Sequence, residues 1–368
     1  VEILGNVYEQ FLGKVIRLTP AHQAKVEEKP EVKKAGGVYY TPAYIVEYIV
    51  KNTVGALVEG KSPAQLKGFR VLDPACGSGS FLLGAYQYLL DHCLRWYTAN
   101  GPEKYKRAVY QTADSAWHLS TAEKKRILLE HLFGVDIDRQ AVEVTKLSLL
   151  LKVLEDESDL TLNRQLTLLP AEAGERVLPN LDRNIKCGNS LIGPDYFSGQ
   201  MLPDEAELRR VNPFDWAREF PEAMKAGGFD CVIGNPPYLF ITELDNDEKA
   251  YFFSHYQTSE YRFDVYGLFI ELAIRELMRR GGYLSFIIPH SLLSNDSFEK
   301  LRRLLLTESF LESVIDIGPG VFAGAKNESM IFLAQNNKAR NPTEITHVII
   351  TTAQTFPKQV KEFRVKQR

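Results

Sequence analysis

Residues 69–79 read FRVLDPACGSG, and the rest of the chain is organised around them. A short apolar run ends at Asp73 and passes into a turn that contains Gly77 and Gly79. A helical stretch follows over residues 80–97. Glycine lets a backbone turn tightly and approach a ligand closely. A strand, a glycine turn and a helix in this order predict the first unit of an α/β sheet with a ligand at the strand end.

The remaining chain repeats this alternation of short apolar runs and helical stretches. Strands are expected at Arg70–Asp73, Leu132–Asp136, Ile185–Gly188, Asp230–Gly234, Tyr283–Pro289, Ser313–Gly318 and Ser329–Ala334. Helices are expected at Ser80–Tyr97, Arg139–Leu154, Tyr266–Arg280 and Asp296–Leu306. Alternation of strands and helices of these lengths predicts an α/β fold with a doubly wound, mainly parallel sheet and helical insertions.

Composition and periodicity divide the chain into an N-terminal helix with a charged linker, a main catalytic domain, and a linker or the start of a further module, at residues 1–35, 36–335 and 336–368. The N-terminal helix is expected at Gly5–Leu18, and a strand of the further module at His347–Thr352. The polar segments 98–130 and 155–183 are expected to be surface insertions. Thr41 before Pro42 predicts a helix start, with Thr41 as the N-cap.

The bulk numbers exclude some classes of protein and leave others open. The 368 residues carry a formal net charge of −3, so a nucleic-acid partner must be argued from local features. The four cysteines form no CxxC pair, which predicts neither a zinc site nor a disulfide framework, and no other metal is expected. No apolar run is long enough for a membrane span, and no signal peptide is visible. A cytoplasmic protein with reduced thiols is expected, and the first residue, Val1, suggests a segment of a longer polypeptide.

Three successive strand ends carry residues suited to a nucleoside cofactor. Asp73 can pair with a cationic group, and the absence of a GKS or GKT ending together with this acid argues against a phosphate loop. The next strand ends GVDID, where Asp136 can accept from two ribose hydroxyls. The third ends CGNSL, where Asn189 can accept from an adenine amine or donate to a ring nitrogen. A zwitterionic, cationic ligand such as S-adenosylmethionine fits this set.

The fourth strand runs into Asn235-Pro236-Pro237-Tyr238. The two prolines remove N–H donors and stiffen the turn, which leaves the Asn235 side-chain oxygen and the Pro236 carbonyl free to accept. Two fixed acceptors can hold both hydrogens of a planar amino group and localise its nitrogen lone pair for attack on a methyl group. Catalysis would then consist of positioning, with no covalent enzyme intermediate. The Tyr238 ring offers a face on which a base can stack.

The four motifs DPACGSG, GVDID, GNSL and NPPY stand in the order found in the amino-methyltransferases of restriction–modification systems. With GGVYYTPAYIV upstream, the chain resembles the gamma class of adenine-N6 DNA methyltransferases. Type IIG enzymes, which fuse nuclease, methylase and specificity modules, Type I modification subunits and related phage-defence methylases share this pattern. The resemblance covers residues 36–335 and implies the Rossmann-like class I methyltransferase fold, S-adenosylmethionine as cofactor, and double-stranded DNA as substrate. It also implies that nuclease and target-recognition modules lie in the same full-length chain.

Carried over by position, the resemblance assigns a role to each motif residue. The methionine part of the cofactor would be enclosed by Tyr39, Tyr40 and Thr41, its amino-acid end held by Asp73, Ala75 and Gly77, its ribose by Asp136, and its adenine approached by Ile137 and Asn189. The family often has Asp where this chain has Asn189, which weakens that last assignment.

The target adenine, flipped out of the duplex, would be bound by Asn235, Pro236 and Tyr238. Val321-Phe322 resembles the later motif whose aromatic ring packs against the flipped base, although an aromatic after a glycine-rich turn is as often plain packing.

Three other functions share these residues. An NPPY methyltransferase that acts on a protein glutamine or on an RNA base presents the same planar NH2 group. Cytosine-N4 methylation is a second alternative, for which the loop more often begins with Ser than with the Asn235 found here. The third is a catalytically inactive module that binds the cofactor and acts through interactions.

Overall fold

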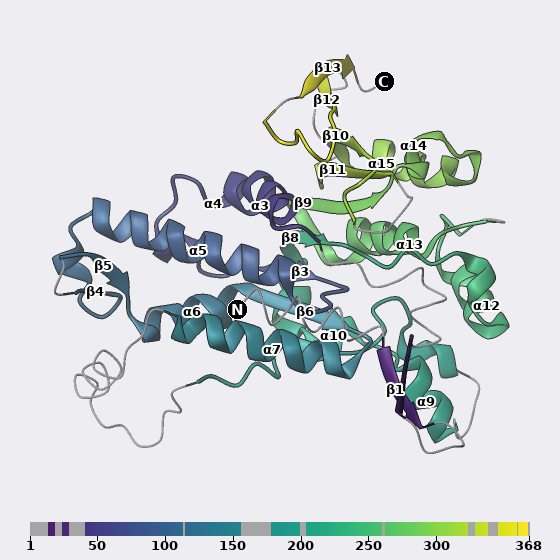
Figure 1. Cartoon of the computed structure of the whole chain (residues 1–368), viewed down its shortest axis with the longest axis horizontal. Helices are drawn as coiled ribbons and strands as arrows, with labels where there is room; N and C mark the ends of the chain where they lie inside the picture. Colours follow the sequence, from purple (N-terminus) through teal and green to yellow (C-terminus); the bar gives the residue numbers. More distant parts are fainter. Residues whose placement is uncertain are drawn as a thin grey trace.

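A nine-stranded mixed sheet forms the centre of the molecule in the computed structural model (Figure 1). Its strand order is β13-β12-β10-β11-β9-β8-β3-β6-β7. The structure describes residues 14–18, 24–28, 41–112, 115–155, 178–198, 204–259, 262–322, 328–337, 345–358 and 360–366.

The strands of the central sheet are β3 Val71–Asp73, β6 Leu132–Asp136, β7 Ile185–Cys187, β8 Phe229–Gly234, β9 Met278–Pro289, β10 Phe310–Gly318, β11 Ser329–Gln335, β12 Ile345–Ile350 and β13 Lys361–Lys366. β7, β6, β3, β8 and β9 run parallel to one another, so their carboxyl ends meet at one edge. β11 pairs antiparallel with both β9 and β10. The chain runs from β3 outward to β6 and β7 and then returns to β8 on the other side of β3. Ligands bind at such a topological switch point in open α/β sheets.

Helices cover both faces of the sheet. One face carries α3 Ala43–Val50, the π-helix η1 Lys51–Gly55, α4 Ala56–Val58, α5 Ser80–Ala99, α6 Thr121–His131 and α7 Arg139–Leu154. The other carries α9 Glu205–Val211, α10 Trp216–Glu219, α11 Pro221–Lys225, α12 Asn246–His255, α13 Val265–Leu272, the π-helix η6 Ala273–Leu277, α14 Ser291–Ser294 and α15 Glu299–Glu308. Successive residues of a strand point to opposite faces, and Val71 packs into the first core while Leu72 packs into the second. This confirms the predicted doubly wound α/β fold. No helix within the described residues is long and apolar enough to cross a membrane.

The predicted strands and the helices at residues 80–97 and 139–154 lie within one to five residues of the observed boundaries. The predicted helix Tyr266–Arg280 is wrong at its end, because η6 stops at Leu277 and β9 already begins at Met278. The register between β8 and β9 shifts over Phe229–Cys231, so residues 279–282 form a bulge beside Asp230. Gly281 takes φ +80° there, which glycine accommodates without strain.

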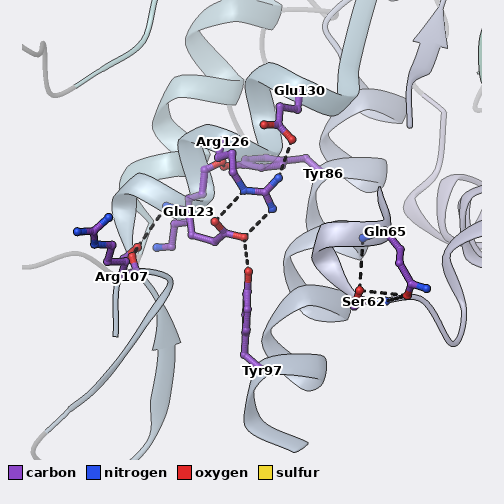
Figure 2. Close-up of polar contacts among 10 residues, drawn as sticks. Ser62, Gln65, Tyr86, Tyr97, Arg107, Glu123, Arg126 and Glu130 are labelled. Atoms are coloured by element: carbon purple, nitrogen blue, oxygen red, sulfur yellow. Dashed lines mark hydrogen bonds and ion pairs between the residues drawn. The ribbon is translucent and has the colours of Figure 1, made fainter. Parts of the chain in front are cut away.

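The prediction that segment 98–130 is a surface insertion is wrong for its last third, because residues 121–130 belong to α6. Ile127 and Leu128 of α6 are fully buried, after a small hairpin of β4 Val109–Gln111 and β5 Trp117–Leu119. The buried carboxylate of α6, Glu123, is paired within the protein. Figure 2 shows the Glu123 carboxylate accepting from Tyr97 of α5 and from Arg126, which also contacts Glu130. Charged residues suggested a solvated segment, but their mutual pairing allows burial.

The structure has strands near both ends of the chain. The predicted helix Gly5–Leu18 is wrong over its last residues, because β1 Lys14–Leu18 pairs antiparallel with β2 Ala24–Glu28, while residues 1–13 lie outside the described residues. The sequence KVIRL contains two adjacent β-branched residues, which favour a strand. Near the C-terminus, β12 pairs parallel with β10, and β13 adds to β12. The sheet therefore continues beyond residue 335, at the top of Figure 1.

Candidate active site

The glycine turn after β3 places the Asp73 carboxylate at the switch point. Asp73 is buried, and its Oδ1 accepts from the Ala75 N–H at 3.1 Å. Gly77 and Gly79 have φ values of +51° and +88°, which favour glycine. Burial raises the pKa of the Asp73 carboxyl to about 8, the Ala75 N–H opposes this shift, and the negative charge of Asp136 adds to it. Asp73 is therefore a group that a cationic ligand would stabilise.

Neighbouring strands and helices hold this turn in place. The Gly77 N–H donates to Asp136 Oδ2 at 2.8 Å, and the Gly77 carbonyl accepts from Thr145 of α7 at 2.7 Å. Ser190, which follows β7, donates to the Pro74 carbonyl at 2.6 Å. The three sequence motifs after β3, β6 and β7 are thus joined by hydrogen bonds into one edge.

Asp136 ends β6 beside the glycine turn, as predicted. Its second oxygen, Oδ1, accepts from the Asp138 N–H at 2.8 Å. Burial raises the pKa of Asp136 to about 6, although the N–H groups of Asp138 and Gly77 lower it. Each carboxylate oxygen has more than one lone pair, so Asp136 can still accept from a ligand hydroxyl.

Ile137 and Asn189 lie at the ends of the two neighbouring strands, β6 and β7. Ile137 is 53% exposed, which is unusual for a large apolar residue at this edge and leaves a surface on which an aromatic ring can rest. Asn189 Oδ1 accepts from the Leu191 N–H at 3.1 Å. This oxygen keeps a second lone pair, and no described residue accepts from the side-chain NH2, so both roles considered for Asn189 stay open.

β8 brings the NPPY loop directly against the glycine turn that follows β3. A Cβ atom placed on Gly234 would lie 2.6 Å from Asp73 Oδ1, so only glycine fits at this point. The residue that precedes Asn235 is thus in contact with the acid of the glycine turn. The two sites predicted separately from the sequence form one continuous site.

Only one of the two polar atoms of the Asn235 side chain has a hydrogen-bond partner among the described residues. Its Nδ2 donates to Thr41 Oγ1 at 3.2 Å, while its Oδ1 is buried and has no hydrogen-bond partner among the described residues. No described residue donates to the Pro236 carbonyl either. Buried polar atoms without partners are rare in proteins and call for a ligand or an ordered water. The loop therefore presents the two acceptors that the sequence predicted.

Tyr238 stands behind these acceptors with its ring held in position. Its hydroxyl donates to the Ile287 carbonyl of β9 at 3.0 Å, and burial raises the pKa of this phenol well above its ordinary value. Phe322 packs edge-on against Tyr238, with ring centroids 6.4 Å apart. Phe322 is buried and belongs to the apolar core, so in this structure its ring supports Tyr238.

Asp264 is a residue of this site that the sequence reasoning missed. It is buried, and its Oδ1 accepts from Leu239, the residue after Tyr238, at 2.9 Å. The same oxygen accepts from Tyr266 at the start of α13, at 3.4 Å. Burial raises the pKa of Asp264 to about 7. The aspartate lies in YRFDVYGLF and is the N-cap of α13, a role that gives no sign in the sequence of its contact with Leu239.

The Thr41 side chain has a different local role from the one predicted. The N-cap residue of α3 is Pro42, without a side-chain cap, so Thr41 as N-cap is wrong by one residue. Its hydroxyl instead contacts Asn235. Tyr39 and Tyr40 lie outside the described residues.

A cavity of about 630 Å³ lies beyond β7, between α7 and the loop before α10. None of the predicted site residues lines it. Its walls carry charges of both signs that pair with one another, such as Lys146 with Asp182 and Lys186 with Glu219. These pairs leave no charge signature for a particular ligand.

Two family models match the chain. The Eco57I restriction-modification methylase model matches residues 130–322, more than half of the chain, and the N-6 DNA Methylase model matches residues 1–177.

Two relatives extend this likeness. The type II restriction enzyme and methyltransferase RM.Eco57I of Escherichia coli is 32% identical over 320 residues, covering 86% of this chain and 29% of the relative. A type II restriction enzyme and methyltransferase assigned to Methanocaldococcus jannaschii, RM.MjaORFECS2P, is 24% identical over 510 residues, covering 98% of this chain and 39% of the relative. The chain thus spans less than half the length of these relatives.

Solved structures share the fold. The Type ISP restriction-modification enzyme LlaBIII, solved bound to DNA, aligns with a TM-score of 0.55 at 16% identity, over 86% of this chain and 20% of that one. At this identity the likeness concerns the fold alone, and the family models carry the assignment. On the match over residues 130–322, this chain belongs to the Eco57I restriction-modification methylase family.

Proposed function

We propose that this chain transfers a methyl group from S-adenosylmethionine to the exocyclic N6 amine of adenine in double-stranded DNA. The observation that carries the proposal is the buried, unpartnered Oδ1 of Asn235 beside the cofactor turn. Family membership and the order of the four motifs support it.

The residues at the edge fit the proposed cofactor. The buried Asp73 carboxyl, held in the glycine turn by the Ala75 N–H, suits the cationic amino-acid end, and Asp136 suits two ribose hydroxyls. The exposed Ile137 and the free NH2 of Asn189 suit its adenine. The chemistry expected of this cofactor is an electrophilic methyl group on a sulfonium.

The chain itself makes the target nitrogen reactive. The lone pair of an aromatic amine is delocalised into its ring, which makes the nitrogen a poor nucleophile. Asn235 Oδ1 and the Pro236 carbonyl would each accept one amine hydrogen, which favours a pyramidal nitrogen with a localised lone pair. These acceptors are fixed by the prolines and by Thr41, so little reorganisation is needed in the transition state. Tyr238 would stack on the base while its hydroxyl remains anchored to β9.

A base inside a duplex cannot reach this pocket, so the target adenine must be flipped out, at a cost of a few kcal/mol. Tyr238, supported from behind by the buried Phe322, would form the aromatic side of the receiving pocket. Tyr39 and Tyr40 are assigned to the cofactor by motif position alone. The relatives named as combined restriction enzymes and methyltransferases are much longer than this chain, which supports nuclease and target-recognition modules in the full-length protein.

A transfer assay tests the proposal. Tritiated cofactor is incubated with the protein and, separately, with unmethylated genomic DNA, ribosomal RNA and a glutamine-containing protein mixture, and the modified DNA is digested for mass spectrometry. Label in DNA that appears as N6-methyladenine is the expected result. N4-methylcytosine, or label only in RNA or protein, would replace the proposed substrate with one of the alternatives. Cofactor binding without transfer to any substrate would indicate an inactive binding module.

A further inference from the structure

The side-chain amide of Asn235 has two possible orientations, and only one suits an incoming amine. In the structure Nδ2 donates to Thr41, and Oδ1 is buried without a partner among the described residues. Turning the amide over would exchange the two atoms and place N–H donors where the acceptor Oδ1 now lies. An aromatic amine is itself a donor, so that orientation would repel the target. Something must therefore select the observed orientation.

Thr41 is the only described residue that hydrogen-bonds to the Asn235 side chain. It is 4% exposed and reaches Asn235 across 194 positions in the chain. A hydroxyl has one hydrogen and two lone pairs, so it can donate to an oxygen or accept from an N–H group. Thr41 alone therefore permits both amide orientations. If its hydrogen is donated elsewhere, only lone pairs remain for Asn235, and the amide must turn its NH2 towards Thr41.

We infer that Thr41 is a positioning residue whose hydroxyl transmits occupancy of the cofactor site to the amide of Asn235. This inference rests on the proposed function. Thr41 contacts Asn235, and the neighbouring Gly234 lies against Asp73, the residue proposed for the amino-acid end of the cofactor. That end carries a carboxylate, which accepts hydrogen bonds and donates none. Thr41 would donate its hydrogen to the carboxylate and accept from Asn235 Nδ2. Asn235 Oδ1 is then fixed towards the target amine.

Cooperative binding of cofactor and target base is the consequence. With the cofactor site empty, part of the population has the amide turned over and cannot receive the base. When the cofactor site is occupied, the Asn235 amide keeps the orientation with Oδ1 towards the target amine, and the base binds more tightly. Coupling between two sites is reciprocal, so the flipped base tightens cofactor binding by the same factor.

The probe is an unmethylated duplex that contains the target sequence. This sequence is first identified by sequencing the methylated DNA product. S-adenosylhomocysteine replaces the cofactor, because it keeps the carboxylate but has no methyl group to transfer. The dissociation constant of the duplex is measured by fluorescence anisotropy with and without this compound, and methyl transfer is measured in a single turnover with both sites saturated. For the wild type we expect about tenfold tighter duplex binding with S-adenosylhomocysteine, within the usual range of coupling.

Variants at position 41 separate the hydroxyl from the rest of the side chain. Thr41→Val and Thr41→Ala should reduce the coupling to about one and slow saturated transfer about tenfold, with duplex affinity in the absence of the compound and melting temperature unchanged. Thr41→Ser should retain the wild-type values. Thr98→Val, whose hydroxyl bonds within α5, is the matched control and should change nothing.

Full coupling and full transfer rate in Thr41→Val and Thr41→Ala would overturn the inference and leave the proposed function standing. Loss of coupling in Thr41→Ser as well would also overturn it, because the hydroxyl would not be the carrier. A wild type that transfers no methyl group to DNA would overturn the proposed function, and this inference with it.

Discussion

Two buried polar clusters of this chain are built in opposite ways. Between α5 and α6, Glu123 accepts from Tyr97 and from two nitrogens of Arg126, and Arg126 also pairs with Glu130 (Figure 2). At the carboxyl edge of the sheet, Asn235 Oδ1 is buried with no partner among the described residues. We call the first cluster closed, because its buried carboxylate has hydrogen-bond partners within the chain. We call the second open, because a buried acceptor has none among the described residues.

The difference separates stability from function. A satisfied network stabilises the fold, because each buried group recovers the hydrogen bonds that it lost with water. An unpartnered buried acceptor costs about 1–3 kcal/mol and persists where a ligand completes it. Substitutions in the open cluster should therefore abolish activity with little loss of stability, and substitutions in the closed cluster should do the reverse.

Asn235→Ala should produce the largest effect. It removes an acceptor that acts on the reacting nitrogen, and loss of one such group lowers the rate about 10²–10³-fold. The melting temperature and the affinity for cofactor should stay close to wild type, because the substitution removes one long hydrogen bond, from Nδ2 to Thr41 at 3.2 Å, and an oxygen without a partner among the described residues. Single-turnover transfer and isothermal titration measure the two quantities. Asn100→Ala on α5 is the matched control, and a wild-type rate in Asn235→Ala would refute the mechanism.

Asp136→Ala should weaken cofactor binding about 100-fold, since a carboxylate that accepts from ribose hydroxyls is worth about 1.5–3 kcal/mol per hydrogen bond. Asp138→Ala, two residues away, removes only the N-cap of α7 and should cost about 1 kcal/mol of stability. Isothermal titration distinguishes the two variants. Equal loss of affinity in both would show that damage to the turn, rather than a ribose contact, is responsible.

Glu123→Ala should lower stability by about 2 kcal/mol, because the Tyr97 hydroxyl and the half-buried guanidinium of Arg126 lose their partner. Glu130→Ala, on the exposed side of the same cluster, should cost less than about 1 kcal/mol. Urea denaturation gives both values. The transfer rate of each folded variant should equal that of the wild type, and a reduced rate would break the separation between the two clusters.

Asp73→Asn should change the measured quantity least among these variants, and it should raise the melting temperature. Burial raises the pKa of Asp73 from 3.8 to about 8, so between these values the folded chain keeps a proton that the unfolded chain has lost. The contribution of Asp73 to stability therefore falls as the pH rises through this range. We expect the variant to melt about 2–4 °C above the wild type near pH 9, with a smaller gap near pH 5. An equal or lower melting temperature of the variant at both pH values would show that burial of the ionised Asp73 carboxylate does not destabilise the fold.

Much of the site could be predicted because its chemistry lies in short contiguous motifs. Asp73, Asp136 and Asn235 each follow an apolar strand, and parallel strands bring their carboxyl ends to one edge. The alternation of strands and helices likewise predicted the sheet. These features depend on local sequence and on general rules of topology.

The contacts that position the site could not be predicted, because they join distant residues. Thr41 and Asn235 are 194 positions apart, and Asp264 bonds to Leu239 from 25 positions away. The same limit applies to α6, where Glu123 is paired locally with Arg126 but also accepts from Tyr97 of α5, 26 positions away. At the N-terminus a helix was expected over the residues that form β1, although the adjacent β-branched residues Val15 and Ile16 favour the observed strand.

The structure of the full chain bound to its target duplex and a non-reactive cofactor analogue tests the central claim most directly. The distance from Asn235 Oδ1 to the N6 nitrogen of the flipped adenine is the measurement. The account predicts a hydrogen bond of about 2.7–3.2 Å, with the Pro236 carbonyl accepting the second hydrogen. A target amine held by other groups, with Asn235 Oδ1 still unpartnered, would contradict it.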